Sequence, residues 1–167
     1  MAALRRSELA ALVVEDIAEH PNGLGISIPR SKTNQAGDQA ELVVLPRGSS
    51  QPHRSPTAAL QAWLDAASIT TGPVFRPVSK GNRTLNRALH PDSINTLIQA
   101  AVARADLDPT AYSSHSLRAG FVTYAHLRGA SDRAIAHQTR HRSLATLGAY
   151  FRVHEAWTDN GATQLGF

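Results

Sequence analysis

The sequence predicts a mainly α-helical domain with a small antiparallel β-sheet near the N-terminus, which is an α+β fold. Three observations predict it. The first 50 residues contain two short runs typical of strands. From residue 55 onward, apolar residues recur at helical spacing behind serine and proline start signals. The 167 residues are enough for one domain with a substantial core.

The first 50 residues supply a helix and the strands. An apolar stripe with charged residues on or beside its edge predicts the opening helix: Leu9, Leu12 and Val13, with Arg5 and Glu8. Leu24, Ile26 and Ile28 then alternate with other residues, and residues 41–45 form a second β-rich run. The polar segment 30–38 between them suits a hairpin connection, and residues 13–17 are candidates for another short strand.

The remaining residues are predicted to form helices and one loop. Ser55-Pro56, Pro91, Ser131 and Ser143 are start signals, and Gly129 is a stop signal. Segment 70–90 contains glycines, prolines and polar residues, so it is predicted to be a loop. The expected helices are 58–67, one from Pro91 that ends before Pro109, 115–128, 132–139, 144–152 and a last amphipathic piece at 155–165.

The composition excludes several classes of protein. Without cysteine the chain cannot be a disulfide scaffold, a thiol enzyme or a zinc ribbon. It has no signal-peptide pattern and no apolar run near the roughly 18 residues of a membrane span. The net charge is +4, and only Lys32 and Lys80 among its 17 cations are lysines. We therefore expect a cytoplasmic domain with a polyanionic partner and no membrane contact.

Two polar motifs have more than one interpretation. His115 and Arg118 are three residues apart on a predicted helix, so both side chains lie on one face. Such a pair can serve a phosphate, because arginine neutralises its oxygens and histidine moves or shares a proton. Taken alone, the pair is more typical of a basic surface. Arg5 likewise suits either a functional role or a simple pairing with Glu8.

Four motifs taken together resemble the catalytic domain of the tyrosine recombinases, the phage-integrase family. They follow the family's order across nearly the whole chain: Ala-Leu-Arg-Arg-Ser-Glu-Leu at 3–9, Ser-Lys-Thr at 31–33, His-Ser-Leu-Arg-Ala-Gly at 115–120, and His141 with Tyr150 nine residues later. The resemblance implies that a tyrosine attacks a phosphodiester of double-stranded DNA. A 3′-phosphotyrosine forms and a 5′-hydroxyl is released, without metal, ATP or any other cofactor.

The resemblance also implies a role for each matched residue. Positive charge is needed because a phenol is a weak acid and the phosphorane carries extra negative charge. Arg5 and Arg118 would hold the non-bridging oxygens, and Lys32 would be the general acid for the 5′-oxygen. His115 would act as acid and base, His141 as a further hydrogen-bond donor, and Tyr150 as the nucleophile.

The sequence offers few competitors for these roles. Lys80 is the only other lysine and lies in the predicted loop, although Lys32 also suits a solvated turn. Tyr124 lies within an apolar helix face and is predicted to belong to the core. Tyr112 precedes the His115 helix, where it can contact backbone or DNA. Tyr150 would be an ordinary core aromatic only if the other motifs are ignored.

Two features depart from the family's pattern. Arg140 stands directly before His141, where the family usually has glycine. There it either adds a phosphate contact or distorts the turn that presents His141. Met1 falls almost at the first catalytic arginine. We therefore expect residues 1–167 to be the catalytic domain alone, without an N-terminal core-binding domain or the first catalytic-domain helix, and to bind DNA weakly.

Residues 153–167 have two interpretations of their own. Trp157, Gly161 and Leu165 recur every four residues and form a narrow apolar face. This segment either packs on its own core or docks on a neighbouring protomer, as the family does in a homo-tetramer on DNA.

Other functions stay open. The chain suits a truncated domain that binds DNA without cleaving it, or a strand-nicking and closing enzyme like a type IB topoisomerase. The eight histidines also suggest a metal-dependent hydrolase, with His137 and His141 at i,i+4 spacing. The glutamate of the HExxH pattern is absent and the acids are scattered, so we expect neither a metal nor a small-molecule substrate.

Overall fold

The computed structural model describes residues 2–29, 40–47, 55–141 and 147. In chain order these residues form α1 (Arg6–Ala11), the 3₁₀ turn η1 (Val14–Asp16), β1 (Ile17–His20), β2 (Gly23–Ile28), β3 (Glu41–Pro46), α2 (Pro56–Ala66), α3 (Pro91–Arg104), the 3₁₀ turn η3 (Pro109–Ala111), α4 (Ser114–Leu127) and α5 (Asp132–Thr139). The predicted fold class, mainly α with a small N-terminal antiparallel sheet, is confirmed.

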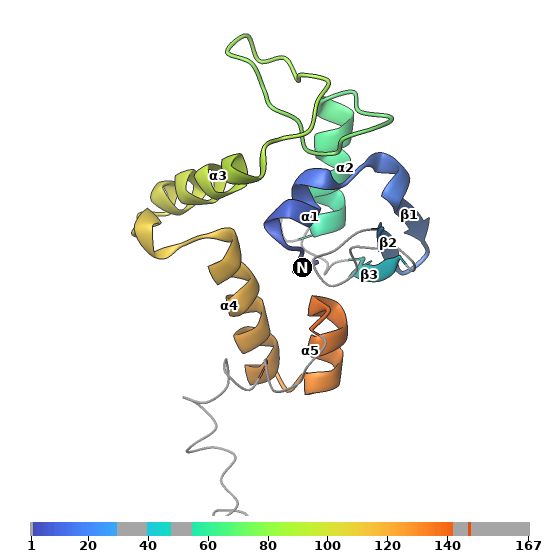
Figure 1. Ribbon diagram of the computed structural model, residues 1–167, viewed down its shortest axis with the longest axis vertical. Coiled ribbons are helices and arrows are strands. Elements are labelled where there is room, and N and C mark those ends of the chain that lie inside the picture. The colour runs from blue at the N-terminus through green and yellow to red at the C-terminus, as the bar shows by residue number, and fades with distance from the viewer. Residues whose placement is uncertain (1, 30–39, 48–54, 142–146, 148–167) are drawn as a thin grey trace, which may run out of the picture.

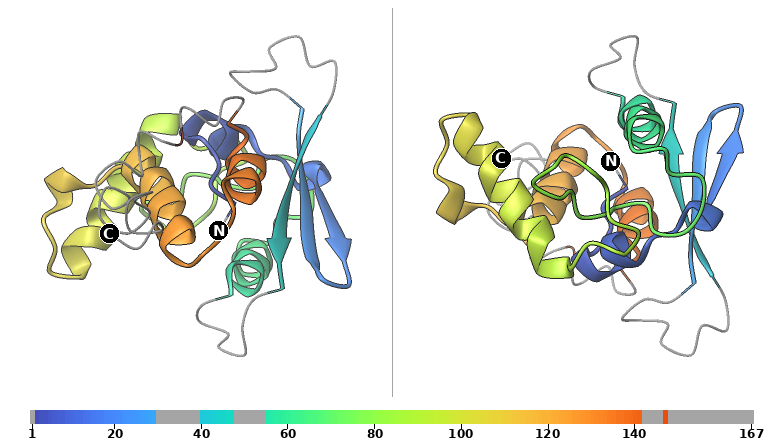
Figure 2. Two further views of the ribbon diagram at one scale, coloured as in Figure 1. Left: turned by 90° about the horizontal axis from the view of Figure 1, so that it is seen from below. Right: turned by 90° about the horizontal axis from the view of Figure 1, so that it is seen from above.

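The sheet lies on the opposite side of the molecule from helices α3 and α4 (Figure 1). The three strands and α2 lie on one side, α3 and α4 on the other, and α1 and α5 between them (Figures 1 and 2). Helices α1 and α5 therefore face both sides of the fold, and their ends lie near its centre (Figure 2).

The sheet has the order β1-β2-β3 with antiparallel pairing throughout. Residues of β3 alternate across it, since Val43 and Leu45 are buried whereas Leu42 and Val44 are exposed. The buried face packs with Leu12 and with part of α2 in one core cluster. The strand predicted from alternation at 24–28 and the strand predicted from the β-rich run 41–45 are both confirmed. Of the candidate strand 13–17, only Ile17 belongs to a strand, while Val13 forms an isolated bridge with Pro73.

The start and stop signals place the helices correctly. Ser55 and Ser131 cap α2 and α5, their Oγ atoms accepting the backbone N–H of Ala58 and Ala134, each at 3.3 Å. Segment 70–90 contains no helix, and its only pairings among the described residues are two isolated bridges, so the predicted loop is confirmed. No helix in the described part of the chain is long and apolar enough to cross a membrane.

The prediction that Tyr124 belongs to the core is wrong. Its side chain is 66% exposed, whereas Val122 on the same helix is fully buried against α5. Two residues correspond to about 200° around an α-helix, so Tyr124 lies on the face opposite Val122. The residues around Tyr124 are apolar, but only one face of α4 meets the core.

Several predictions lie outside the described residues. These are the hairpin connection 30–38, the helix 155–165, and nearly all of the helix 144–152. Leu147, which is described, is helical and fully buried with Val122 and Ile135.

We predict opposite effects for two glycines of the α4 region. Gly129 has φ +80° just after the helix, where the Gly129 and Ala130 N–H groups close the last turn on His126 O and Ala125 O. Gly129→Ala is expected to lower the free energy of unfolding by about 1 kcal/mol, because an L side chain disfavours this backbone conformation. Gly120 lies inside α4 with open space around it, so Gly120→Ala is expected to raise that free energy by up to about 1 kcal/mol. Urea unfolding measures both, and effects of equal sign would contradict this account.

Candidate active site

Three of the six predicted site residues line one hollow. Arg5, His115 and Arg118 surround it, and its volume is about 330 Å³. It lies where the start of α1 meets the N-terminal parts of α3 and α4, and its other lining residues are Leu4, Arg6, Asn95, Ser113 and Ser114. Two arginines and a histidine in one hollow suit an anionic ligand.

The start of α4 is held by side chains at this hollow. Ser113 caps the helix, with its Oγ 3.1 Å from Ser116 N, while Ser116 Oγ is 2.7 Å from Ser113 N. Asn95 of α3 accepts the Ser114 N–H at 3.0 Å. These contacts fix the positive end of the α4 dipole at the hollow, next to the exposed His115.

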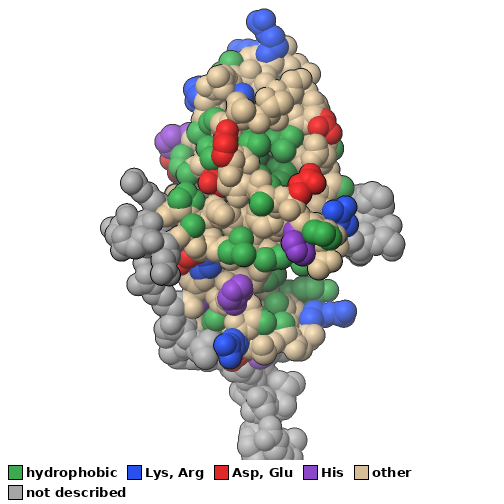
Figure 3. Space-filling view, turned by 90° about the vertical axis from the view of Figure 1, so that its right-hand side faces the viewer, with side chains coloured by type: hydrophobic (Ala, Val, Ile, Leu, Met, Phe, Trp, Pro, Cys, Tyr) green, Lys and Arg blue, Asp and Glu red, His purple; other side chains and the backbone are tan. Residues whose placement is uncertain are grey.

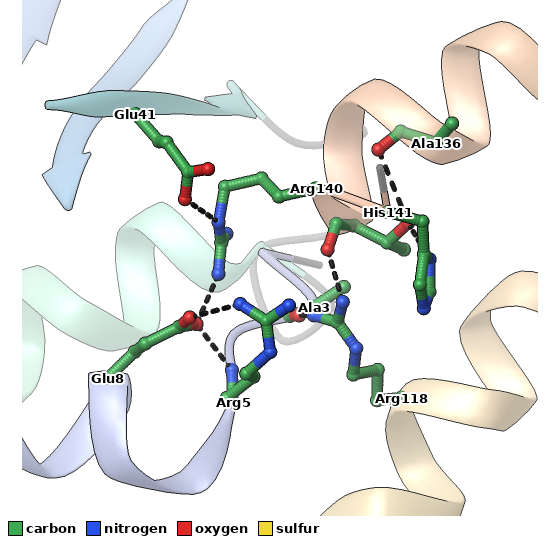
Figure 4. A network of polar contacts seen from close by, with 9 residues as sticks. Ala3, Arg5, Glu8, Glu41, Arg118, Ala136, Arg140 and His141 are labelled. Carbon is green, nitrogen blue, oxygen red and sulfur yellow. Dashed lines mark hydrogen bonds and ion pairs between the residues drawn. The ribbon is translucent and has the colours of Figure 1, made fainter. Parts of the chain in front are cut away.

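Arg118 is a buried bridge between distant parts of the chain. Its side chain comes from α4 and only 9% of the residue is exposed. Nη1 donates to Ala3 O and Nη2 donates to Thr139 O (Figure 4). The interpretation of His115 and Arg118 as a basic surface pair is therefore wrong for Arg118, because its guanidinium joins the N-terminus to the end of α5.

Arg5 is paired with Glu8, and it also lines the hollow. Its backbone N–H is 2.7 Å from Glu8 Oε2, and its Nη1 is 2.6 Å from Glu8 Oε1. The Glu8 side chain is only 2% exposed. The predicted pairing is confirmed, but it does not exclude a role in the site, because Arg5 also lines the hollow.

The turn that presents His141 is well formed. Arg140 ends α5 with φ +56° and ψ +43°, and the His141 N–H donates to Ala136 O at 3.0 Å. These bonds match those at Gly129, so Arg140 takes a backbone conformation that glycine favours. The idea that arginine distorts this turn is therefore wrong.

The Arg140 side chain turns toward two carboxylates. Its Nη2 donates to Glu8 Oε2, and its Nε is 3.1 Å from Glu41 Oε2 (Figure 4). These two partners were not predicted from the sequence. The only indication in the sequence was Glu8 beside the apolar stripe of the first helix, because a carboxylate that becomes buried there needs a positively charged partner.

His141 is held through Thr139. The Thr139 Oγ1 atom is 2.6 Å from Ile135 O and 2.6 Å from His141 Nδ1. A carbonyl can only accept, so the single hydroxyl proton goes to Ile135 O and the hydroxyl oxygen accepts from Nδ1–H. The neutral imidazole is thus the Nδ1–H tautomer, in which Nε2 carries a lone pair.

The same surroundings act on the acid strength of His141 and Glu8. Burial lowers the pKa of His141, and the charges of Arg118, Arg5 and Arg140 lower it further. Burial raises the pKa of Glu8, but hydrogen bonds from Arg5 and Arg140 outweigh this and hold the pKa below its usual value. Glu8 is therefore ionised and His141 favours its neutral form.

We predict that the His141 titration is visible in both spectra and stability. Its imidazole should titrate below the midpoint of the same residue in the urea-unfolded chain. The unfolded chain then takes up the proton first, so the free energy of unfolding falls as pH drops from the usual histidine pKa toward the lowered one. Long-range ¹H–¹⁵N imidazole spectra should show Nδ1 protonated above this window. Thr139→Val should remove the preference for the Nδ1–H tautomer. An Nε2–H tautomer in the parent chain would contradict the tautomer assigned to His141.

Two of the six predicted site residues, Lys32 and Tyr150, lie outside the described residues, so their placement stays a prediction.

His137 and His141, the pair considered as metal ligands, do not share a helix face, because α5 ends at Thr139. Within the described ranges, no three His, Asp or Glu side chains are grouped so as to hold a metal ion.

Cations do not gather on every face. On the face shown in Figure 3, the visible lysine and arginine side chains are spread singly among apolar and polar ones. The convergence of Arg5 and Arg118 on one hollow is therefore a local feature rather than part of a general basic coat.

Comparisons with known proteins agree with this description. Residues 1–156 match the model of the Phage integrase family. The chain is 33% identical over 163 residues to an integrase/recombinase XerD homolog of Selenomonas ruminantium, covering 98% of this chain and 47% of that protein. The chain thus spans about half the length of this curated relative.

Solved structures share the fold. The XerA recombinase gives a TM-score of 0.66 at 21% identity, over 95% of this chain and 52% of that one. The XerH site-specific recombinase gives 0.65 at 21% identity in a pre-cleavage complex with its difH substrate, over 94% of this chain and 42% of that one. Its post-cleavage complex with a palindromic difH substrate gives a TM-score of 0.69 at 18% identity, over 99% of this chain and 43% of that one.

Proposed function

The chain belongs to the phage integrase family of site-specific tyrosine recombinases, and from that premise we propose that it cleaves and rejoins DNA strands through a covalent 3′-phosphotyrosine. The observation that carries the proposal is the meeting of Arg5, Arg118 and His115 at one hollow. These residues come from two helices that are distant in the sequence, and their chemistry suits a phosphodiester.

The two arginines would stabilise the charge that develops on phosphorus. A trigonal-bipyramidal phosphorane bears more negative charge on its non-bridging oxygens than the phosphodiester does. Donors that are already fixed in place stabilise that charge without reorganising during the reaction. Arg118 is fixed by two carbonyl oxygens and Arg5 by the Glu8 carboxylate.

The proton transfers would use His115 and Lys32. The Tyr150 phenol loses its proton to His115, and its oxygen bonds to phosphorus as the bond to the 5′-oxygen breaks. Lys32 gives a proton to that leaving oxygen, and the reverse steps rejoin the strand. His141 is neutral before substrate binds, so it donates from Nε2 only after taking up a proton, which a bound phosphate favours.

The proposed partner is double-stranded DNA, on which four copies of the chain assemble in the cytoplasm. Support comes from the XerH recombinase, which was crystallised with its difH substrate. No metal, nucleotide or small-molecule cofactor enters the proposed reaction. Residues 1–167 would form the catalytic domain, with 153–167 as the segment that docks on a neighbouring copy.

A trapping experiment tests this function. The chain is mixed, in EDTA, with random-sequence duplexes that each carry a nick, so that the short strand released with its 5′-hydroxyl diffuses away. A covalent protein–DNA adduct is the expected result. DNA binding by the folded chain without any adduct would overturn the catalytic proposal. Relaxation of supercoiled DNA at no preferred sequence would instead indicate a topoisomerase-like activity.

A further inference from the structure

A cluster of four charged side chains lies between the sheet and the candidate site. Arg5, Glu8, Glu41 and Arg140 come from the start of α1, from β3 and from the end of α5 (Figure 4). The side chains of Glu8 and Arg140 are 2% and 5% exposed, and that of Glu41 is 27% exposed. Charges this deeply buried interact strongly, because little water screens them.

Keeping an arginine at position 140 costs stability in two ways. Its left-handed backbone conformation disfavours any L side chain relative to glycine. Its buried Nη1 atom, in addition, has no hydrogen-bond partner among the described residues, and a buried donor without a partner lowers stability. Glycine would avoid both costs, so stability of the turn does not explain this side chain.

Arg140 and Arg5 share the carboxylate of Glu8. Oε2 accepts from Arg140 Nη2 and from the Arg5 backbone, while Oε1 accepts from Arg5 Nη1. Because both oxygens are occupied, the carboxylate has one orientation, and the Arg5 guanidinium is fixed with it. Without Arg140, Oε2 would lose one of its two donors, so the carboxylate would be less firmly oriented and Arg5 with it.

Arg140 also fixes the end of α5 to the sheet. Its Nε contacts Glu41 at the start of β3, and Gln138 Nε2 is 3.0 Å from Val44 O farther along that strand. The turn with His141 follows directly. One guanidinium thus connects the sheet, the support of Arg5 and the turn that presents His141.

We propose that Arg140 is a positioning residue for strand cleavage, which orients Arg5 through the shared carboxylate of Glu8. This inference rests on the proposed function. Arg140 itself need not touch the DNA, because its described partners are carboxylates.

Arg140→Gly tests the inference with little risk to the fold. Glycine accepts the turn, and Glu8 keeps Arg5 as its partner, so no buried charge is left alone. On the nicked duplexes, single-turnover adduct formation should slow about tenfold, while the dissociation constant for DNA stays within about twofold. Arg140→Lys keeps the positive charge and should recover at least half of the lost rate of adduct formation, on a logarithmic scale. Arg133→Gln, which removes an exposed cation from the same helix, is the matched control and should cleave at the parent rate.

A neutral substrate separates positioning from general damage. A methylphosphonate at the cleaved position lacks one negative charge, so it depends less on the arginines. The defect of Arg140→Gly should shrink to less than about threefold on it. An equal defect on both substrates, or parent-like cleavage by Arg140→Gly, would overturn the inference. Absence of any adduct from the parent chain would overturn the proposed function itself, so the two failures are distinguishable.

Discussion

Tyr150→Phe is expected to reduce the covalent adduct on nicked DNA to background. Phenylalanine keeps the ring but lacks the oxygen that would bond to phosphorus, so no 3′-phosphotyrosine can form. Binding of DNA should persist, because the change removes no charge. The adduct is measured by denaturing gel, and the modified tyrosine is identified by peptide mass spectrometry.

The other tyrosines supply the controls for this experiment. Tyr124 is 66% exposed on the face of α4 opposite Val122, so Tyr124→Phe should form the adduct at the parent rate. Tyr112 is half-buried just before α4 and is the competing nucleophile. An adduct that survives in Tyr150→Phe, or that maps to Tyr112, would refute the assignment.

Arg118→Lys is expected to slow adduct formation by about 10²–10³. Lysine keeps the positive charge, but its single ammonium cannot contact Ala3 O and Thr139 O together while also facing the phosphate. A carbonyl without a partner should also lower the free energy of unfolding by about 1–3 kcal/mol. Rates are therefore measured at a temperature where urea unfolding shows the variant to be fully folded.

Arg128→Lys is the matched control for Arg118→Lys. Arg128 is exposed at the other end of the same helix, where it caps α4. The same chemical change there should leave cleavage within about twofold of the parent, as surface substitutions usually do. Cleavage by Arg118→Lys within about threefold of the parent would show that charge alone suffices at this position.

Local patterns predicted most of the fold. Serine caps and prolines placed α2 and α5, apolar alternation placed β2, and a β-rich run placed β3, because these signals act within a few residues. Tyr124 shows the limit of such patterns. An apolar neighbourhood does not reveal which face of a helix meets the core, since that depends on where α5 packs.

The candidate site could be predicted only in part. Helical spacing and motif order pointed to Arg5, His115 and Arg118, which the structure brings to one hollow. Glu8, which holds Arg5, was predicted from its i,i+3 spacing, whereas the partners of Arg118 and Arg140 carry no local signal. Arg118 meets Ala3 from 115 positions away, and Arg140 meets Glu8 from 132 positions away. Such pairs depend on the tertiary arrangement, so neither the proposed role of Arg140 nor the burial of Glu8 could be predicted from the sequence.

The length of chain spanned by these contacts has a consequence for folding. Contacts between residues far apart in sequence form late, because the entropy of closing a long loop must be overcome first. The bonds of Arg118 to Ala3 and of Arg140 to Glu8 join residues 115 and 132 positions apart, and each separation is more than two thirds of the 167-residue chain. A nascent or partly folded chain therefore lacks the arginine arrangement, and the proposed strand cleavage would become possible only when folding is complete.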